Sequence, residues 1–171
     1  MKPSICLLFL SVSLLLFFSA CKKENLIEDT PILKEEKAYP NVPKTIWIYF
    51  QRFEEAAEKQ GIAIDLNAQN ISAEIMEITE DGVAGTCSYG SHQPEHIVID
   101  KTFWKETSDL FKEMIVFHEL GHCSLFLGHR EEVNADGTCA SIMRSGLGDC
   151  RDNYRVSTRE SYWEELFKRV K

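Results

Sequence analysis

Apolar side chains recur along residues 45–60 at the spacing of a helix. Ile46, Phe50 and Phe53 fall on one side, and charged residues lie mainly on the other. This period of 3.6 residues is typical of a helix that packs one face on a core. Gly61 follows as a natural C-terminal stop. We therefore predict a helix over 45–60, although its aromatic-rich start is also compatible with a strand.

Alternation replaces this period in the next part of the chain. Apolar and polar residues alternate over 62–66 and over 71–79, and a short apolar run fills 97–99. A period of two is typical of half-buried strands. The pair Asp81-Gly82 predicts a turn, and the Gly-rich polar segment 83–95 predicts a loop. We expect three strands, the second of them with a bulge.

The longest apolar stretch, 110–127, again has a helical period. Thr107 or Ser108 supplies an N-cap side chain, and Gly128 is a natural helix stop. The following residues have no clear period until 157–170, which predicts a closing amphipathic helix. The order of elements predicts an α+β fold. In it, a twisted, mostly N-terminal β-sheet packs on the long helix, and a C-terminal helix completes the domain.

The first 21 residues have the features of a processing segment. Lys2 precedes an apolar run over 5–18, which is short for a membrane span. The sequence Phe18-Ser19-Ala20-Cys21 resembles the lipobox of bacterial lipoproteins, with Phe18 in place of the usual Leu. That resemblance implies lipidation of Cys21 and attachment to a bacterial membrane, the outer membrane above all. An ordinary secretory signal is the alternative, and both place the mature protein outside the cytoplasm.

Residues 22–43 are charged and contain three prolines, so we interpret them as a tether, with an inhibitory pro-segment as the alternative. Residues 44–171 then form one domain, as expected for a chain of 171 residues. The formal net charge of −8 argues against a nucleic-acid partner, which would require a basic face.

The sequence His118-Glu119-Leu120-Gly121-His122 carries the clearest chemistry. On a helix, positions i and i+4 lie on the same face, so His118 and His122 would present two imidazoles to one point. That arrangement suits the first two ligands of a zinc ion. Glu119 lies beside them, where it can accept a proton from a zinc-bound water.

This motif, followed by Gly128, His129 and the downstream Ser141-Ile142-Met143, resembles the metzincin clan of zinc metallopeptidases. It is also similar to small zinc-peptidase-like lipoproteins of Bacteroidetes-type bacteria. The resemblance implies that His129 is the third ligand and that Met143 lies beneath the metal in a tight turn. In metzincins the third His comes six residues after the second, whereas here it comes seven after. The carboxylates that could replace His129 are Glu131, Glu132 and Asp136.

The resemblance implies an extracytoplasmic zinc-dependent endopeptidase. It would hydrolyse peptide bonds through a zinc-bound water, with Glu119 as general base and one catalytic zinc ion as cofactor. The expected partners are a peptide or protein substrate, held along an edge strand at Ile97–Ile99, and a membrane reached through the lipid. We expect a monomer and no nucleic acid. The alternatives are a non-catalytic, zinc-stabilised binding lipoprotein of the same fold and a hydrolase of peptidoglycan amides.

Four further cysteines, Cys87, Cys123, Cys139 and Cys150, remain in a chain that is exported. None of them has the spacing of a second zinc site, and four cysteines allow three pairings. We favour Cys139–Cys150, which would close the loop around Met143, together with Cys87–Cys123, which would hold the Gly-rich loop to the long helix. Cys123–Cys139 stays open as an alternative. His92 and His96 have no ligand spacing and are expected to lie in the loop and at a strand edge.

Overall fold

The first helix, α1 (Lys44–Lys59), forms where the sequence predicts it. It begins after Pro43 and ends before Gly61, whose φ of 74° is left-handed. The structure, a computed structural model, describes residues 36–90 and 93–170, which all belong to one unit, Glu35–Lys171. The predicted apolar side of α1 is the buried side, and Phe50 and Phe53 are fully enclosed.

A three-stranded mixed sheet follows α1 in the described residues. It consists of β1 (Ser72–Met76), β2 (Gly85–Gly90) and β3 (Gln93–Asp100), in the order β1-β3-β2. Strand β3 is parallel to β1 and antiparallel to β2. Together with the helices, this sheet makes the domain α+β, as predicted.

Two details of the predicted sheet are wrong. The segment 83–95, predicted as a loop, contains β2 and the start of β3, with a register shift between Ser88 and Gly90. The residues Ile97–Ile99 lie in the central strand, and β1 and β2 are the edge strands. Backbone pairing with β3 stabilises a Gly-rich polar segment whose side chains carry no strand period.

The strand predicted over 62–66 is also wrong. These residues belong to no helix or strand, with Leu66 fully buried, and no strand pairs with them in the described part of the chain. The Glu54 carboxylate on α1 accepts a hydrogen bond from the Leu66 N–H at 2.8 Å. The Asp65 carboxylate then accepts the N–H groups of Asn67 and Ala68 and turns the chain. Side-chain acceptors thus replace a partner strand.

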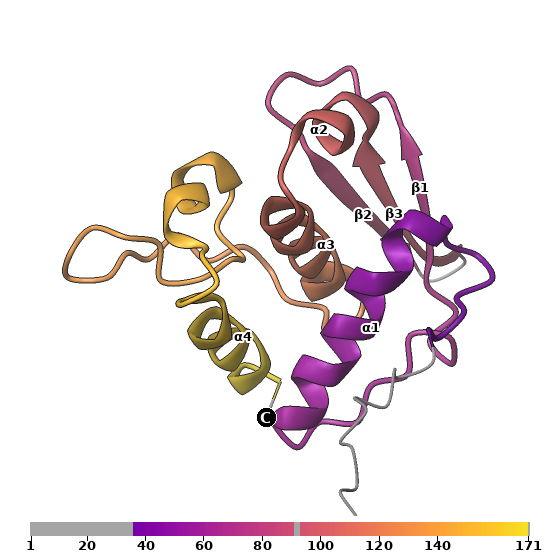
Figure 1. The fold of residues 1–171 in the computed structure, drawn as a ribbon, viewed down its shortest axis with the longest axis horizontal. Coiled ribbons are helices and arrows are strands. Elements are labelled where there is room, and N and C mark those ends of the chain that lie inside the picture. The colour runs from indigo at the N-terminus through magenta and orange to yellow at the C-terminus, as the bar shows by residue number, and fades with distance from the viewer. Residues whose placement is uncertain (1–35, 91–92, 171) are drawn as a thin grey trace, which may run out of the picture. The chain divides into compact units, whose positions relative to one another are not determined.

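Side-chain caps set the starts of the next two helices. Asp100 caps α2 (Lys101–Glu106), and Ser108 caps α3 (Asp109–Cys123), as the sequence predicts for Ser108. A 3-10 helix, η1 (Leu147–Asn153), and α4 (Arg159–Lys168) complete the described elements. Figure 1 shows the strands next to α2 and α3, with α4 on the other side of α3. Helix α3 therefore lies at the centre of the domain.

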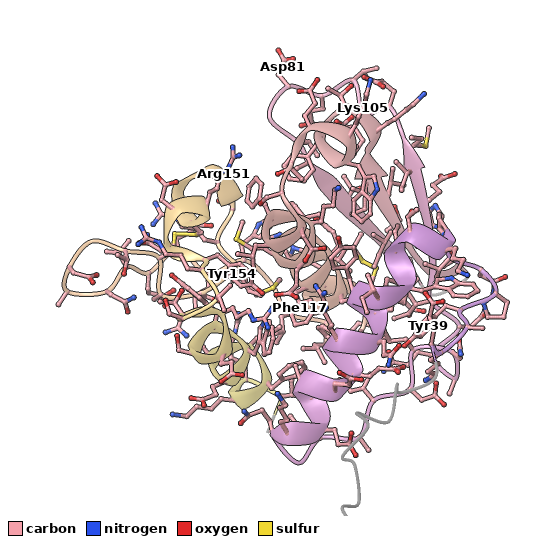
Figure 2. All side chains as sticks on the ribbon, viewed as in Figure 1. Tyr39, Asp81, Lys105, Phe117, Arg151 and Tyr154 are labelled. Carbon is pink, nitrogen blue, oxygen red and sulfur yellow. A yellow bond between two sulfur atoms is a disulfide. The ribbon has the colours of Figure 1, made fainter. Side chains whose placement is uncertain are left out.

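Aromatic rings join the three long helices. Phe53 on α1 lies edge-on to Phe117 on α3 and to Phe167 on α4, with ring centroids 5.1 Å apart in both pairs. Trp163 on α4 lies 5.4 Å from Phe117. Figure 2 shows Phe117 among these helices. Such contacts bury much apolar area and fix the relative positions of the helices.

A buried charged group adds to this junction. The Glu113 side chain on α3 is fully enclosed, and its carboxylate receives Arg52 of α1 at 2.9 Å and Arg159 of α4 at 3.2 Å. Tyr154 donates a hydrogen bond to the same carboxylate at 2.9 Å. A buried carboxylate is stable only when it is paired, so these three side chains must stay in contact with Glu113. They position α3 five residues before His118.

The N-terminal part of the described chain packs on the domain. Tyr39 and Val42, in the segment interpreted as a tether, are buried, and Tyr39 donates a hydrogen bond to Glu54. Cys21 and most of the predicted tether lie outside the described residues. No helix in the described ranges is long and apolar enough to cross a membrane.

Candidate metal centre

Helix α3 brings His118 and His122 together one turn apart. Their ring centroids lie 4.7 Å apart, and the Nε2 atoms lie 3.1 Å apart. His118 is buried and His122 is partly buried. The i, i+4 spacing of the sequence therefore has the predicted geometric result.

The helix ends earlier than the sequence predicts, and Gly128 is not its stop. The C-cap is Ser124, and the chain reverses at Phe126, whose φ of 54° is left-handed. The Leu127 N–H then bonds back to the Gly121 carbonyl at 2.9 Å. Gly128 does not have a left-handed φ, so the helix end does not depend on the conformational freedom of a glycine at this position. The sequence did not predict this turn, because the left-handed conformation is usually adopted by glycine and here Phe126 adopts it.

The reversal at Phe126 returns His129 to the two helical histidines. His129 Nε2 lies 3.2 Å from His122 Nε2, and the His129 ring centroid lies 5.4 Å from that of His118. One ligand nitrogen from each of the three lies within 4.8 Å of the others. The seven-residue spacing therefore still brings the third imidazole to the other two.

Backbone carbonyls fix the orientation of two of these rings. His118 Nδ1 lies 2.6 Å from the Ile142 carbonyl, and His122 Nδ1 lies 2.6 Å from the Leu127 carbonyl. Because a carbonyl only accepts, both Nδ1 atoms carry the proton, and each neutral ring keeps its lone pair on Nε2. The two Nε2 atoms face each other at 3.1 Å without a proton between them. A cation between them would satisfy both lone pairs.

The spacing of the nitrogens suits a small divalent metal. Tetrahedral coordination with metal–nitrogen bonds of 2.0–2.1 Å separates two ligand nitrogens by roughly 3.3 Å. Two of the three separations, 3.1 and 3.2 Å, lie close to that value, and the third pair lies within 4.8 Å. The residues present therefore fit a metal ion, and within the described residues these three histidines form the only group of three or more potential ligands that does.

Burial keeps the two helical histidines neutral. Desolvation lowers the pKa of His118 to about 4, although its hydrogen bond to Ile142 acts in the opposite direction. Desolvation also lowers the pKa of His122. Neutral imidazole is the form that binds a metal, so protons do not compete with a metal for these two rings at neutral pH.

Glu119 lies beside the histidine group and is almost fully buried. Burial raises the pKa of its carboxyl group to about 8. Strand β2 comes close to this side chain at Gly85, where a Cβ atom would lie 2.8 Å from Glu119 Oε1. Gly85 therefore leaves the room that the carboxyl group occupies. The sequence contained no sign of this role, because Gly85 looked like one of several loop glycines.

Met143 lies against the same helix, as the metzincin resemblance implies. It is fully buried, and a Cβ atom at Gly121 would lie 2.3 Å from its Sδ atom. The Arg130 N–H donates to the Met143 carbonyl at 2.8 Å, next to His129. The turn that contains Met143 therefore contacts both the helix and the segment of the third histidine. Gly121, inside the motif, makes the close approach possible.

Both favoured disulfides are present. Cys87 on β2 pairs with Cys123 at the end of α3, with Cα atoms 5.7 Å apart. Cys139 pairs with Cys150 on η1, with Cα atoms 5.3 Å apart. The first bond joins the edge strand to the helix of the two ligands. The second joins the segment before Met143 to η1.

The remaining sequence candidates do not belong to the group of potential metal ligands. Glu131 accepts hydrogen bonds from Ser145, Glu132 pairs with Arg130, and Asp136 accepts from Thr138. These three carboxylates were the alternatives to His129. His96 on β3 contacts Ser72 and Glu74 of β1, and His92 lies outside the described residues.

A cleft of about 760 Å³ opens onto the group. It is lined by His118, Glu119 and His129, by residues 82–85, by residues of α2 and of the first half of α3, and by Ser145, Gly146 and Arg151. This volume is within the range of ligand-binding sites. The sequence gave no signal for the part of the lining formed by Ser145, Gly146 and Arg151.

Comparisons with protein-family models, with curated proteins and with solved structures found no match to this chain.

Proposed function

We propose that the chain is a zinc-dependent endopeptidase that acts on peptides or proteins outside the cytoplasm. The observation that carries this proposal is the convergence of three imidazoles beside a buried carboxyl group on the floor of a cleft. Structural zinc sites have four protein ligands, whereas catalytic sites have three and leave one position for water or substrate. The described residues offer three, and two of them line the cleft.

His118, His122 and His129 would hold the zinc ion, which would supply Lewis acidity toward a substrate carbonyl and a water and would lower the pKa of the neighbouring Glu119. The chain's own contribution begins with the two backbone carbonyls that orient His118 and His122. Such outer partners hold ligands in position and raise their basicity.

Glu119 is the proton carrier of the proposal. Its Oε1 atom lies at the Gly85 end of the cleft, close to the histidine group and shielded from bulk water. Burial raises the pKa of this carboxyl group, and a bound metal would lower it again, so that near neutral pH the group could accept a proton from water and release it to the leaving amine. A purely structural zinc site would have no use for such a group.

Strand β2 is the proposed site of the substrate backbone. It is one of the two edge strands of the sheet, and in the described residues no strand pairs with its outer side. Its first residue, Gly85, lines the cleft. An extended peptide can add to such an edge through main-chain hydrogen bonds. This arrangement would bring a peptide carbonyl past Glu119 with little dependence on side chains.

Relationship to the metzincins and location at a membrane belong to the same proposal. The support for the first is the order of motif, third histidine and buried Met143, with Phe126 at the chain reversal. The support for the second is the sequence around Cys21 and the two disulfides, which form in oxidising compartments. Incorporation of labelled fatty acid into the full chain, and its loss in Cys21→Ser, tests the lipid anchor.

The test of function is hydrolysis of a mixed peptide library by the zinc-loaded mature protein, followed by mass spectrometry. We expect cleavage that a chelator abolishes and added zinc restores. Replacement Glu119→Gln should lower the rate by about 10²–10⁴-fold. The matched control is Glu106→Gln, because Glu106 is exposed and lines the same cleft. It should retain activity.

Two results would contradict the proposal. Cleavage that survives in Glu119→Gln would come from another protein or another site. A zinc-loaded protein that cuts no peptide, yet whose stability depends on zinc, would favour the alternative of a non-catalytic binding lipoprotein.

A further inference from the structure

The cleft has two exposed charges that no described residue neutralises. Its ionisable lining residues, apart from the histidines, are Asp100, Glu106, Glu119 and Arg151. The Asp100 carboxylate already has hydrogen-bond partners, because it accepts from the N–H groups of Phe103 and Ile78. Glu119 is buried beside the histidines. Glu106 and Arg151 are exposed, and neither forms an ion pair with a described side chain.

Arg151 differs from Glu106 in being held in place. Its guanidinium lies over the Phe111 ring of α3, 4.8 Å from the centroid. The neighbouring Cys150 is fully buried and is bonded to Cys139, which anchors η1. Figure 2 shows Arg151 on η1. Glu106, at the end of the six-residue α2, has no hydrogen bond to any described residue that fixes its side chain.

A stacked guanidinium at a cleft wall is suited to one class of ligand group. Stacking on an aromatic face leaves the N–H groups at the edge of the guanidinium plane available. That edge matches a carboxylate, which it can bind through two parallel hydrogen bonds. The apolar wall around it, with Phe111 and Ile115, can pack against the methylene groups of the same side chain.

Arg151 is a positive group in a protein whose overall charge is negative. With a formal net charge of −8, the protein as a whole repels acidic peptides. A substrate carboxylate therefore needs a fixed positive group where it binds, and among the described residues Arg151 is the only Lys or Arg that lines the cleft.

We propose that Arg151 makes the cleft selective for peptides with a glutamate or aspartate side chain close to the scissile bond. This inference rests on the proposed function, because it assigns a specificity to the same cleft. Arg151 is a specificity-determining residue in this account and takes no part in the chemistry.

The test uses three peptides that differ at one position, which is Glu, Gln or Lys, and are blocked at both ends. Blocked ends ensure that only the side chain can offer a carboxylate. Binding is measured by fluorescence anisotropy to zinc-loaded Glu119→Gln protein, which cannot turn the peptides over. At low salt we expect the Glu peptide to bind about fivefold more tightly than the Gln peptide, the upper end for an exposed ion pair of about 1 kcal/mol.

Substitutions then assign the preference to a residue. Added to the binding protein, Arg151→Gln should make the Glu and Gln peptides bind equally, and Arg151→Lys should restore only part of the difference. Glu106→Gln is the matched control, since it removes the other unpaired charge of the cleft, and it should leave the preference for Glu intact. A high salt concentration should reduce the preference in the parent protein. Thermal unfolding of each variant checks that the fold is retained.

Two outcomes would overturn the inference. One is an unchanged ratio of Glu to Gln binding in Arg151→Gln. The other is tightest binding of the Lys peptide, with loss of that preference in Glu106→Gln. Cleavage assays with Glu119 intact keep the two proposals separate. If the protein cleaves peptides but cleavage does not depend on Arg151, only the inference about Arg151 is refuted. If peptide binding depends on Arg151 but no peptide is cleaved, only the peptidase proposal is refuted.

Discussion

The contact between Gly121 and Met143 gives the sharpest test of how the centre is assembled. Replacement Gly121→Ala would place a Cβ atom 2.3 Å from Met143 Sδ and 3.0 Å from its Cε. Met143 is fully buried, with the Leu166 side chain also close to the new atom. The methionine therefore has to move, and the turn that carries it has to move with it.

Two opposing effects set the magnitude. Overfilling a packed core costs about 1–3 kcal/mol. Exchanging glycine for alanine inside a helix contributes about 1 kcal/mol of stability. For Gly121→Ala we expect a net loss of about 1 kcal/mol in the free energy of unfolding. Because the Ile142 carbonyl next to Met143 orients His118, we also expect weaker metal binding.

The assay is urea unfolding under non-reducing conditions, arranged as a double-mutant cycle with Met143→Ala. Once the sulfur is absent, Gly121→Ala no longer clashes, and the helix preference should then stabilise the protein by about 1 kcal/mol. The coupling between the two sites should therefore be about 2 kcal/mol. The matched control is Gly128→Ala, since a Cβ atom there meets nothing within 4 Å. A zero coupling, or a Gly121→Ala variant as stable as its parent, would refute the contact.

Three further predictions concern the framework. Glu113→Gln should lower the free energy of unfolding by about 1–3 kcal/mol, because it leaves two partly exposed arginines without their anion; a urea titration measures this. Hydrogen bonds from Phe103 and then Ile78 lower the pKa of Asp100. Its contribution to stability is therefore present above the unfolded pKa of about 4 and is lost as the pH falls further, and the difference between parent and Asp100→Asn should shrink in that range. Replacing Cys139 and Cys150 together by Ser should cost about 3 kcal/mol of unfolding free energy, given their separation of 11 residues.

Each of these has an opposite outcome. A Glu113→Gln variant within about 0.5 kcal/mol of its parent would mean that the charged group does not hold the three helices together. A parallel pH dependence of parent and Asp100→Asn would remove the N-cap from the account. An unchanged midpoint in the double Cys variant would show that the loop before η1 is ordered without its disulfide.

The predictable parts of the site are those that depend on short-range geometry. His118 and His122 are four residues apart on a helix, so their meeting follows from the helical period alone. The sequence favours the pairs Cys87–Cys123 and Cys139–Cys150, both of which the structure contains, but it leaves Cys123–Cys139 open as an alternative. The N-cap at Ser108 is likewise a local side-chain effect.

The parts that could not be predicted depend on backbone pairing and on distant contacts. Strand β2 is stable because β3 pairs with it and Cys87 is tied to α3, although its own residues carry no strand period. The chain reverses before His129 at Phe126, so the prediction that the helix stops at Gly128 placed the reversal two residues too late. The disulfide of the neighbouring Cys150 and the contact with the Phe111 ring position Arg151 at the cleft, and neither contact has a sequence pattern.

The most direct test of the central claim is a zinc titration of the mature protein against a competing chromogenic chelator. The account predicts one zinc ion per chain, with affinity reduced more than about 100-fold by His118→Ala, His122→Ala or His129→Ala. His96→Ala is the matched control and should bind zinc like the parent, because His96 contacts Ser72 and Glu74 on the sheet. Absence of tight zinc binding, or an affinity unchanged by His129→Ala, would contradict the account.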